Sequence, residues 1–352
     1  MVGRSRTAAV AFVVALGLAS CGTGSPAPAT SSPAGRPTTV AIPSASAAGQ
    51  GPSASTASTG TSPTATPEAS IVTTKKVGER VVDIVVRSPA VGAEVPVRLL
   101  LPARFSRERS RTWPVLYLLH GCCDSYVSWT RSTDIERLTR NRDVLVVMPD
   151  GGRVGFYADW LRGSRWETFH LVELPKLLRE QYRAGGRRAV VGVSMGGLGA
   201  LDYAARHPGM FRLAASFSGI VHTRFSADTS DDYVGLVQSE GEDGLGLWGD
   251  PRTDAAVWRA HNPYDLAPRL RGTKLVIAAG DGDAGPLDRP GTAPDPIEAT
   301  LGSQNKAFAR RVRALNLDAT IDLYGNGTHN WVYWQRELHR AWPAITSALG
   351  VR

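Results

Sequence analysis

Short apolar runs alternate with longer helical patterns through most of the chain. Strands are expected at residues 81–86, 95–101, 115–119, 144–148, 189–193, 213–217, 275–279 and 319–323. Helices are expected at 166–182, with Pro175 as a kink, and at 195–206, 299–315 and 331–349. Continuous apolar strands that alternate with helices are typical of a mostly parallel sheet covered on both faces, so the predicted fold class is α/β. The first two strands flank a turn-rich stretch and predict an antiparallel hairpin at one edge of the sheet.

The N-terminal part has a different composition. Arg4 and Arg6 precede an apolar stretch at residues 8–19, which is too short to span a bilayer and is typical of an export signal. It ends in Leu-Ala-Ser-Cys21, which resembles the lipobox of bacterial lipoproteins. Residues 1–21 are therefore interpreted as a lipoprotein signal peptide, with Cys21 as the acylated residue.

A linker and one large domain follow. Residues 22–74 are rich in Ser, Thr, Pro, Ala and Gly, and such a segment buries too little apolar surface to offset its ordering entropy. It is predicted to be a disordered linker. Residues 75–352 are predicted to form a single α/β domain.

Charge and cysteine content narrow the possible functions. The formal net charge is +8, but no run of basic residues is interleaved with aromatics, so nucleic-acid binding is not indicated. Cys122 and Cys123 are adjacent, and a disulfide between neighbours strains the backbone because consecutive Cα atoms lie closer than disulfides prefer. Free thiols are therefore favoured over a disulfide. No CxxC motif or His/Cys cluster accompanies them, so no metal site is predicted.

A single serine stands between glycines where a predicted strand becomes a predicted helix. The stretch Gly192-Val193-Ser194-Met195-Gly196 joins the strand at 189–193 to the helix at 195–206. Strand, strained turn and helix together form the nucleophile elbow of α/β-hydrolases, in which glycines allow close packing and the serine hydroxyl stands above the sheet. The helix N-terminus favours a developing oxyanion. Ser194 is therefore the predicted nucleophile and the α/β-hydrolase fold the predicted architecture.

A serine nucleophile needs a histidine base, which follows the acid in the chain order of this fold. His329 lies in the loop Gly-Asn-Gly-Thr-His after a predicted strand and is the predicted base. His339 lies in the middle of a helix and is interpreted as an exposed surface residue. His120, directly after a buried strand, is interpreted as shaping the oxyanion loop. Structural roles are expected for the others, which are His170, His207, His222 and His261.

Three carboxylates compete for the role of acid. Asp281 and Asp283 directly follow the strand at 275–279, and Glu298 comes after the Gly/Pro-rich loop at 285–296. Position alone favours Asp283.

Several stretches resemble the esterase D group of α/β-hydrolases, and specifically the secreted mycolyltransferases known as the antigen 85 group. They are Met-Pro-Asp-Gly-Gly at 148–152, Phe-Tyr-Ala-Asp-Trp at 156–160, Trp-Glu-Thr-Phe at 166–169, Gly-Val-Ser-Met at 192–195 and Asn-Gly-Thr-His-Asn-Trp at 326–331, with Tyr333-Trp334 in the last helix. The resemblance spans nearly all of residues 77–348. It implies an acyl-enzyme mechanism without a cofactor.

The resemblance also assigns roles to individual residues. The family's acid is a glutamate about ten residues before a helical phenylalanine, and Glu298 precedes Phe308 by that distance, which favours Glu298 over Asp283. The backbone amides of Met195 and Cys122 would form the oxyanion hole.

Two positions depart from the family. Mycolyltransferases carry an aspartate where His120 stands and a sugar-binding arginine where Cys123 stands. Trehalose mycolate is therefore less favoured as the substrate than simpler esters. Trp160 and Trp331 remain candidate stacking surfaces for a sugar, and His120 a candidate substrate contact.

These observations predict an exported serine esterase or acyltransferase that acts on acyl esters or glycolipids and is attached to the membrane through its lipid anchor. One alternative is a plain carboxylesterase at the cell surface. Another is a non-catalytic, wall-associated binding protein on a hydrolase fold, which the intact Ser/Glu/His set disfavours.

Overall fold

A computed structural model describes residues 67–351. The predicted signal peptide with Cys21, and residues 22–66 of the predicted linker, lie outside this range. Strand β1 (Ser70–Lys76) pairs antiparallel with β2 (Val81–Ser88), so the prediction of a linker through residue 74 is wrong at its C-terminal end. Ile71 and Val72 are the only large apolar residues of this edge strand, which explains why its sequence pattern is weak.

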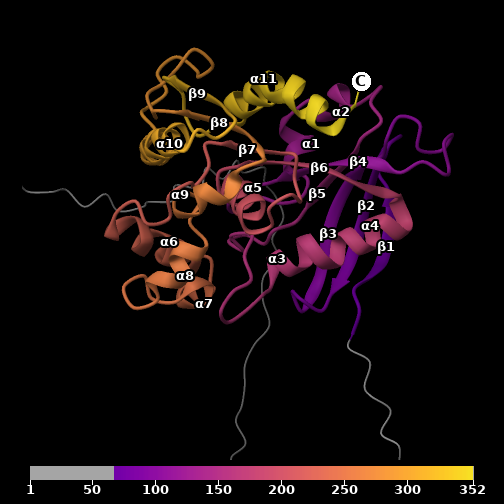
Figure 1. The fold of residues 1–352 in the computed structure, drawn as a ribbon, viewed down its shortest axis with the longest axis horizontal. Helices are drawn as coiled ribbons and strands as arrows, with labels where there is room; N and C mark the ends of the chain where they lie inside the picture. Colours follow the sequence, from indigo (N-terminus) through magenta and orange to yellow (C-terminus); the bar gives the residue numbers. More distant parts are fainter. Residues whose placement is uncertain (1–66, 352) are drawn as a thin grey trace, which may run out of the picture. The chain divides into compact units, whose positions relative to one another are not determined.

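The described residues form one nine-stranded sheet in the order β1-β2-β3-β5-β4-β6-β7-β8-β9 (Figure 1). The predicted hairpin is confirmed, since β2 and β3 pair antiparallel at one edge, and β4 to β9 are parallel to one another. The remaining strands are β3 (Ala93–Leu100), β4 (Trp113–Leu119), β5 (Leu145–Pro149), β6 (Ala184–Val193), β7 (Leu213–Phe217), β8 (Lys274–Gly280) and β9 (Ala319–Gly325).

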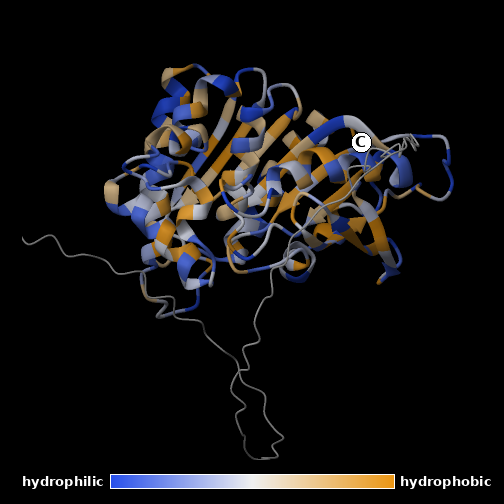
Figure 2. Cartoon of the chain, turned by 90° about the horizontal axis from the view of Figure 1, so that it is seen from below, coloured by the Kyte–Doolittle hydropathy of each residue, from blue (hydrophilic) through white to orange (hydrophobic). Residues whose placement is uncertain are grey.

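Helices cover both faces of the sheet. On one face, α1 (Ser128–Ser132), α2 (Ile135–Leu138) and α11 (Trp331–Leu349) bury Trp129, Ile135 and Leu338 against apolar strand residues. On the other face, α4 (Leu174–Tyr182), α5 (Met195–Arg206) and α10 (Pro296–Ala314) contribute to a second apolar core. Figure 2 shows the apolar colour concentrated in the strands and the polar colour in loops and outer helix faces. No helix within residues 67–351 combines the length and apolarity that a membrane span requires.

The helices at 195–206 and 331–349 have the predicted bounds. The predicted helix at 166–182 is one continuous helical run: α3 (Trp166–Thr168) passes through a π-helical turn (Phe169–Glu173) into α4, which has Pro175 in its first turn. Pro175 has no N–H to donate within this helical run, and the hydrogen-bond pattern is altered in the π-helical turn directly before it. Sequence analysis missed the helices between β7 and β8, which are α6 (Ala227–Ser239), α7 (Gly244–Trp248), α8 (Ala255–Ala260), α9 (Pro263–Leu266) and a 3₁₀ turn (Ala267–Leu270).

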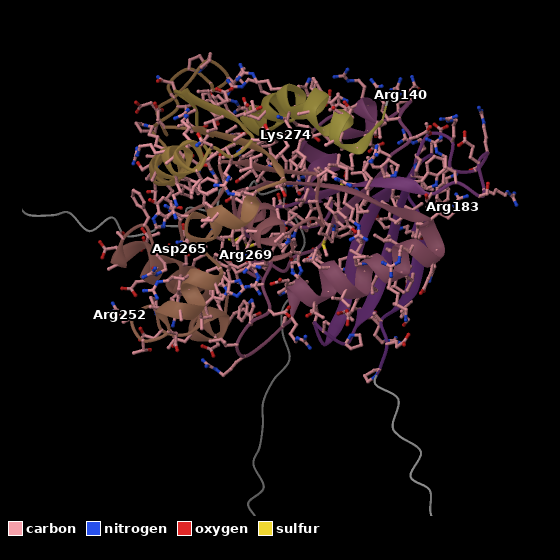
Figure 3. The ribbon with its side chains drawn as sticks, in the orientation of Figure 1. Arg140, Arg183, Arg252, Asp265, Arg269 and Lys274 are labelled. Carbon is pink, nitrogen blue, oxygen red and sulfur yellow. A yellow bond between two sulfur atoms is a disulfide. The ribbon has the colours of Figure 1, made fainter. Side chains whose placement is uncertain are left out.

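Basic side chains are spread over the surface. Arg183 follows α4, Arg140 follows α2 and Arg252 precedes α8, and Figure 3 shows the three well separated on the molecule. Arg252 is paired with Asp231, and Arg183 donates to the carbonyls of Phe105 and Glu108. The positive net charge is thus distributed over separate elements.

A buried ion network ties α3 to α5. Both carboxylate oxygens of Glu167 accept from Nε of Arg206 at 3.1 Å, and Oε1 contacts His207 Nε2 at 2.6 Å. Burial by itself raises the pKa of Glu167, but the hydrogen bond from His207 and the charge of Arg206 outweigh it and hold this pKa below its ordinary value. A carboxylate with a lowered pKa stabilises the fold above its unfolded pKa, and this contribution is lost as the pH falls through the folded pKa.

We expect Glu167→Gln to lower the free energy of unfolding at pH 7 by about 2 kcal/mol, because it removes the nearer of the two carboxylates that pair with Arg206 and leaves only Asp202, at 3.9 Å. The difference from wild type should shrink as the pH falls below about 4. Urea denaturation at several pH values measures both effects. The control is Glu180→Gln on the exposed face of α4, which should change the free energy of unfolding by less than about 0.5 kcal/mol. An equal loss of stability in the two variants would show that the contacts of Glu167 with Arg206 and His207 do not stabilise the fold.

Candidate active site

Ser194 lies on a strained turn between β6 and α5. Its backbone has φ 54° and ψ −121°, a region that residues with a side chain rarely occupy. The turn needs glycines on both sides: a Cβ added at Gly192 would lie 1.9 Å from the carbonyl oxygen of Gly196, and one at Gly196 would lie 2.4 Å from that of Leu119. The close approach of β6 and α5 thus leaves Ser194 as the residue with a side chain at the apex, as the elbow pattern predicts.

His329 and Glu298 form a buried pair. His329 Nδ1 lies 2.7 Å from Glu298 Oε2, and the side chains are 14% and 0% exposed. Because a carboxylate only accepts, Nδ1 carries the proton and Nε2 is left as an acceptor. Nε2 has no hydrogen-bond partner within residues 67–351. Asp283 is exposed, and its backbone N–H donates to Asp281, so Glu298 rather than Asp283 is in contact with His329.

Two residues that sequence analysis missed hold this pair in place. Asp295 caps the N-terminus of α10 by accepting from Ile297 N and Glu298 N, and its other oxygen accepts from His329 N at 2.9 Å. Ser218 follows β7 and donates to Glu298 Oε1 at 2.8 Å. The dipeptide Asp295-Pro296 is a sequence signal for a helix start, and it could have indicated that Glu298 lies in a first helical turn.

Ser194 is connected to the same network through the backbone. Its N–H donates to the carbonyl of Phe217, the residue before Ser218. Ser194, Glu298 and His329 follow or lie beside the carboxyl ends of β6, β8 and β9, which are parallel and therefore end at one edge of the sheet.

The loop after β4 lies against Ser194. A Cβ added at Gly121 would be 3.2 Å from the Cβ of Ser194. The backbone N–H groups of Cys122 and Met195 donate to no acceptor within residues 67–351. Met195 is the first residue of α5, where an N–H has no intrahelical partner.

His120 is 1% exposed, and both ring nitrogens have partners. Nε2 accepts from Gly151 N at 2.9 Å, so Nδ1 carries the proton and donates to the carbonyl of Gly121 at 2.8 Å. This neutral ring supports the loop after β4 and has no free nitrogen for the substrate contact that was considered from the sequence.

Cys122 and Cys123 are joined in a disulfide, so the preference for free thiols is wrong. That preference rested on the short Cα–Cα distance, which is 3.8 Å here. The bond is compatible with a tight turn: Cys123 has φ 63°, and its N–H donates to the carbonyl of Arg153 at 2.8 Å.

The two predicted tryptophan surfaces occupy different environments. Trp160 donates from Nε1 to the carbonyl of Gly155 and lines a cavity of about 190 Å³ together with Arg153 and Glu240. Trp331 packs edge-on against Trp129 and Trp334, with ring centroids 5.2 and 5.0 Å apart.

A larger cavity of about 600 Å³ opens beside His329. Leu287 and Val332, which are 43% and 45% exposed, give it an apolar wall, and Asp288 and Arg289 add charge. Asp288 is held by Tyr333 OH at 2.7 Å and by Thr328 Oγ1 at 2.6 Å.

The other histidines have partners in the protein. His170 is buried between Tyr203 OH and the carbonyl of Asp150, and burial lowers its pKa to about 3. His339 is 40% exposed and contacts Asp134. The ligand atoms of Glu167, Asp202 and His261 lie within 4.8 Å of one another, the spacing of a metal site. However, the Arg206 guanidinium already supplies a positive charge to both oxygens of Glu167, so this donor set does not suit a cation.

The family model described as "Putative esterase" matches residues 88–345. The chain belongs to this esterase family. The chain is 28% identical to the diacylglycerol acyltransferase/mycolyltransferase Ag85B of Mycolicibacterium smegmatis, over 76% of this chain and 85% of that protein. It is 31% identical to Ag85B of Mycobacterium intracellulare, over 67% of this chain and 76% of that protein.

Another relative is the esterase Rv1288 of Mycobacterium tuberculosis, which is 33% identical over 60% of this chain and 45% of that protein. Among solved structures, Mycobacterium tuberculosis MPT51 is 25% identical with a TM-score of 0.63, covering 75% of this chain and 96% of that one. The resemblance to the antigen 85 group and the α/β-hydrolase fold are confirmed, and the relatives support a hydrolase or acyltransferase activity for this esterase.

Proposed function

We propose that this esterase is an exported serine hydrolase or acyltransferase that works through an acyl-enzyme on Ser194. The observation that carries the proposal is the contact of His329 Nδ1 with buried Glu298, which leaves Nε2 ready to accept a proton at the edge of the sheet where Ser194 lies. Ser194 in turn has the backbone of a nucleophile elbow.

The proposed cycle assigns a role to each of these residues. His329 Nε2 takes the hydroxyl proton as Ser194 attacks the ester carbonyl, and Glu298 stabilises the imidazolium that forms. The N–H groups of Met195 and Cys122 donate to the oxyanion. The protonated His329 then returns its proton to the leaving alcohol. Water or a sugar hydroxyl, deprotonated by the same nitrogen, finally takes the acyl group from Ser194.

The proposed substrate is a carboxylic ester or glycolipid. The cavity beside His329 supports this proposal, because its apolar wall suits an acyl or aryl group and its charged residues suit hydroxyl groups. The relatives named as acyltransferases and as esterases support transfer and hydrolysis respectively.

We further propose that the enzyme is exported and anchored to the membrane by a lipid on Cys21, facing the cell wall. The sequence Leu-Ala-Ser-Cys21 and the long charge-poor segment after it support this arrangement. These residues lie outside the described part of the structure.

Ser194→Ala should lower kcat for p-nitrophenyl ester cleavage by about 10³-fold or more, because the acyl-enzyme cannot form. Steady-state kinetics measure this loss, and circular dichroism confirms that the variant is folded. A folded variant with near wild-type activity would show that Ser194 is not the nucleophile.

Glu298→Gln should lower kcat by about 10³-fold, because an amide does not stabilise the imidazolium of His329. Its amide oxygen can still accept from Gly280 N and Ser218, so the fold should survive. The matched control is Asp283→Asn on the exposed loop, which should change kcat by less than about threefold. The opposite ranking would place the acid at Asp283.

With a short acyl ester and millimolar trehalose, we expect more hydrolysis than acyl-trehalose. His120 is buried and Cys123 lies in a disulfide, so neither replaces the charged groups that mycolyltransferases use at these positions. One lost hydrogen bond to a charged group weakens sugar binding by about one to two orders of magnitude. Chromatographic product partitioning is the measurement, and an excess of acyl-trehalose would favour a full mycolyltransferase activity.

Cys21→Ser should release the protein from the membrane without changing esterase kcat, because only the anchor is lost. Cell fractionation with an activity assay measures both. Equal membrane retention of the variant would rule out the lipid anchor.

A further inference from the structure

The Cys122–Cys123 disulfide follows directly on the residue that packs against Ser194. Gly121 is buried against Ser194, and the two cysteines after it are partly exposed. A small thiol in solution can therefore reach the bond, while the backbone that carries it lies beside the proposed nucleophile.

The peptide between Gly121 and Cys122 is already fixed at its carbonyl oxygen. His120 Nδ1 donates to the carbonyl of Gly121, and Gly151 N fixes the tautomer that makes this donation possible. The C=O and N–H of a trans peptide point in opposite directions. Fixing the carbonyl of Gly121 therefore also fixes the direction of the Cys122 N–H, which is one of the two proposed oxyanion donors.

The peptide between Cys122 and Cys123 is also held, and it places Cys123 in a backbone conformation that a free cysteine disfavours. Cys123 has φ 63°, a left-handed backbone that costs a residue with a Cβ about 1 kcal/mol or more. Its N–H donates to the carbonyl of Arg153, and Arg153 Nη1 donates back to its carbonyl at 3.3 Å. The disulfide closes a ring through this same peptide and so opposes its rotation.

A hydrogen-bond acceptor for the reduced Cys123 thiol is already in place. Glu240 Oε1 lies 3.3 Å from Sγ of Cys123, and Glu240 also pairs with Arg153. A sulfur in a disulfide has no proton to donate, whereas a Cys123 thiol would donate to this carboxylate. Reduction would thus replace the ring closure by a hydrogen bond from the Cys123 thiol to Glu240.

We propose that the Cys122–Cys123 disulfide is a redox modification site that sets the activity of this esterase, with the oxidised form the more active. The inference rests on the proposed role of the Cys122 amide in the oxyanion hole. A low-molecular-weight thiol attacks one sulfur as its thiolate and forms a mixed disulfide, which releases the other cysteine as a thiol. A second molecule of that thiol then displaces the first. The products are two cysteine thiols and one disulfide of the small thiol, so two electrons and two protons pass to the protein.

Reduction should weaken binding of the transition state more than binding of the ester substrate. Once the ring is open, Cys123 can leave the left-handed region and the Cys122 N–H is held only from the His120 side. The oxyanion exists in the transition state and not in the bound ester, so kcat should fall more than KM rises.

The test combines alkylation with kinetics on the full chain. Trypsin should release residues 112–131 as one peptide whose only cysteines are Cys122 and Cys123. In protein purified in air, iodoacetamide should modify neither cysteine, and after dithiothreitol treatment it should modify both. Without alkylation, reduction should lower kcat for a p-nitrophenyl ester by about 10-fold or more with KM changed less than about twofold, and reoxidation should restore kcat. Loss of one oxyanion donor costs about 10²- to 10³-fold and sets the upper limit.

Two variants show whether the change in kcat comes from the Cys122–Cys123 disulfide. Cys123→Ser should have the kcat of the reduced wild type and should not respond to dithiothreitol. Cys21→Ser, which removes the third cysteine of the chain, should respond as wild type does. Should Cys123→Ser fail to fold, the reversible change in the wild type still tests the proposal.

Three outcomes would overturn it: alkylation of both cysteines before reduction, complete reduction without a change in kcat, or an equal thiol response in Cys123→Ser. If Ser194→Ala is inactive while reduction has no effect, only the redox proposal fails. If Ser194→Ala stays active, the proposed function fails first.

Discussion

The arrangement of the candidate active site depends on one buried carboxylate. Glu298 has no exposed surface, and three donors surround it: Gly280 N at 2.6 Å, Ser218 Oγ at 2.8 Å and His329 Nδ1 at 2.7 Å. A carboxylate taken out of water without donors would be strongly destabilised as an anion. Each donor belongs to the end of a different strand or the loop after it, so the carboxylate holds the ends of β7, β8 and β9 together. Gly302, one turn later in α10, lets the helix approach Gly280 closely enough for this contact.

The same edge of the sheet explains why the loop after β4 and the turn at Ser194 belong to one unit. Strand β4 lies beside β6, and their ends bring Gly121 against Ser194. Two side chains hold this loop in place. Tyr157 OH donates to the carbonyl of His120 at 2.9 Å, and the His120 ring donates to the carbonyl of Gly121. These contacts are all made between groups of the protein itself, as a preorganised site requires.

Local signals in the sequence were sufficient for the parts of the site that a short segment determines. The elbow combines an apolar strand, glycines and an Ala-rich helix within a few residues, and α5 and β7 have their predicted bounds. The acid could not be chosen in this way, because position after β8 favoured Asp283 and only the spacing in related proteins favoured Glu298. One deciding contact comes from Ser218, which is close to Glu298 in space but lies 80 residues earlier in the chain. The disulfide was also missed, since the left-handed backbone of Cys123 depends on Arg153, thirty residues further along the chain.

The helices between β7 and β8 were missed because their apolar periodicity is weak. Two of them, α7 and α8, are stabilised by burying Trp248 and Trp258 in the core.

The most direct test of the central claim, that Ser194 is a nucleophile activated by His329, is labelling with a fluorophosphonate followed by peptide mass spectrometry. The account predicts a single adduct on Ser194 in the folded protein, and loss of that adduct in His329→Ala and after unfolding, because the isolated hydroxyl is a weak nucleophile. A folded protein that gains no adduct, or gains it on a residue other than Ser194, would contradict the account.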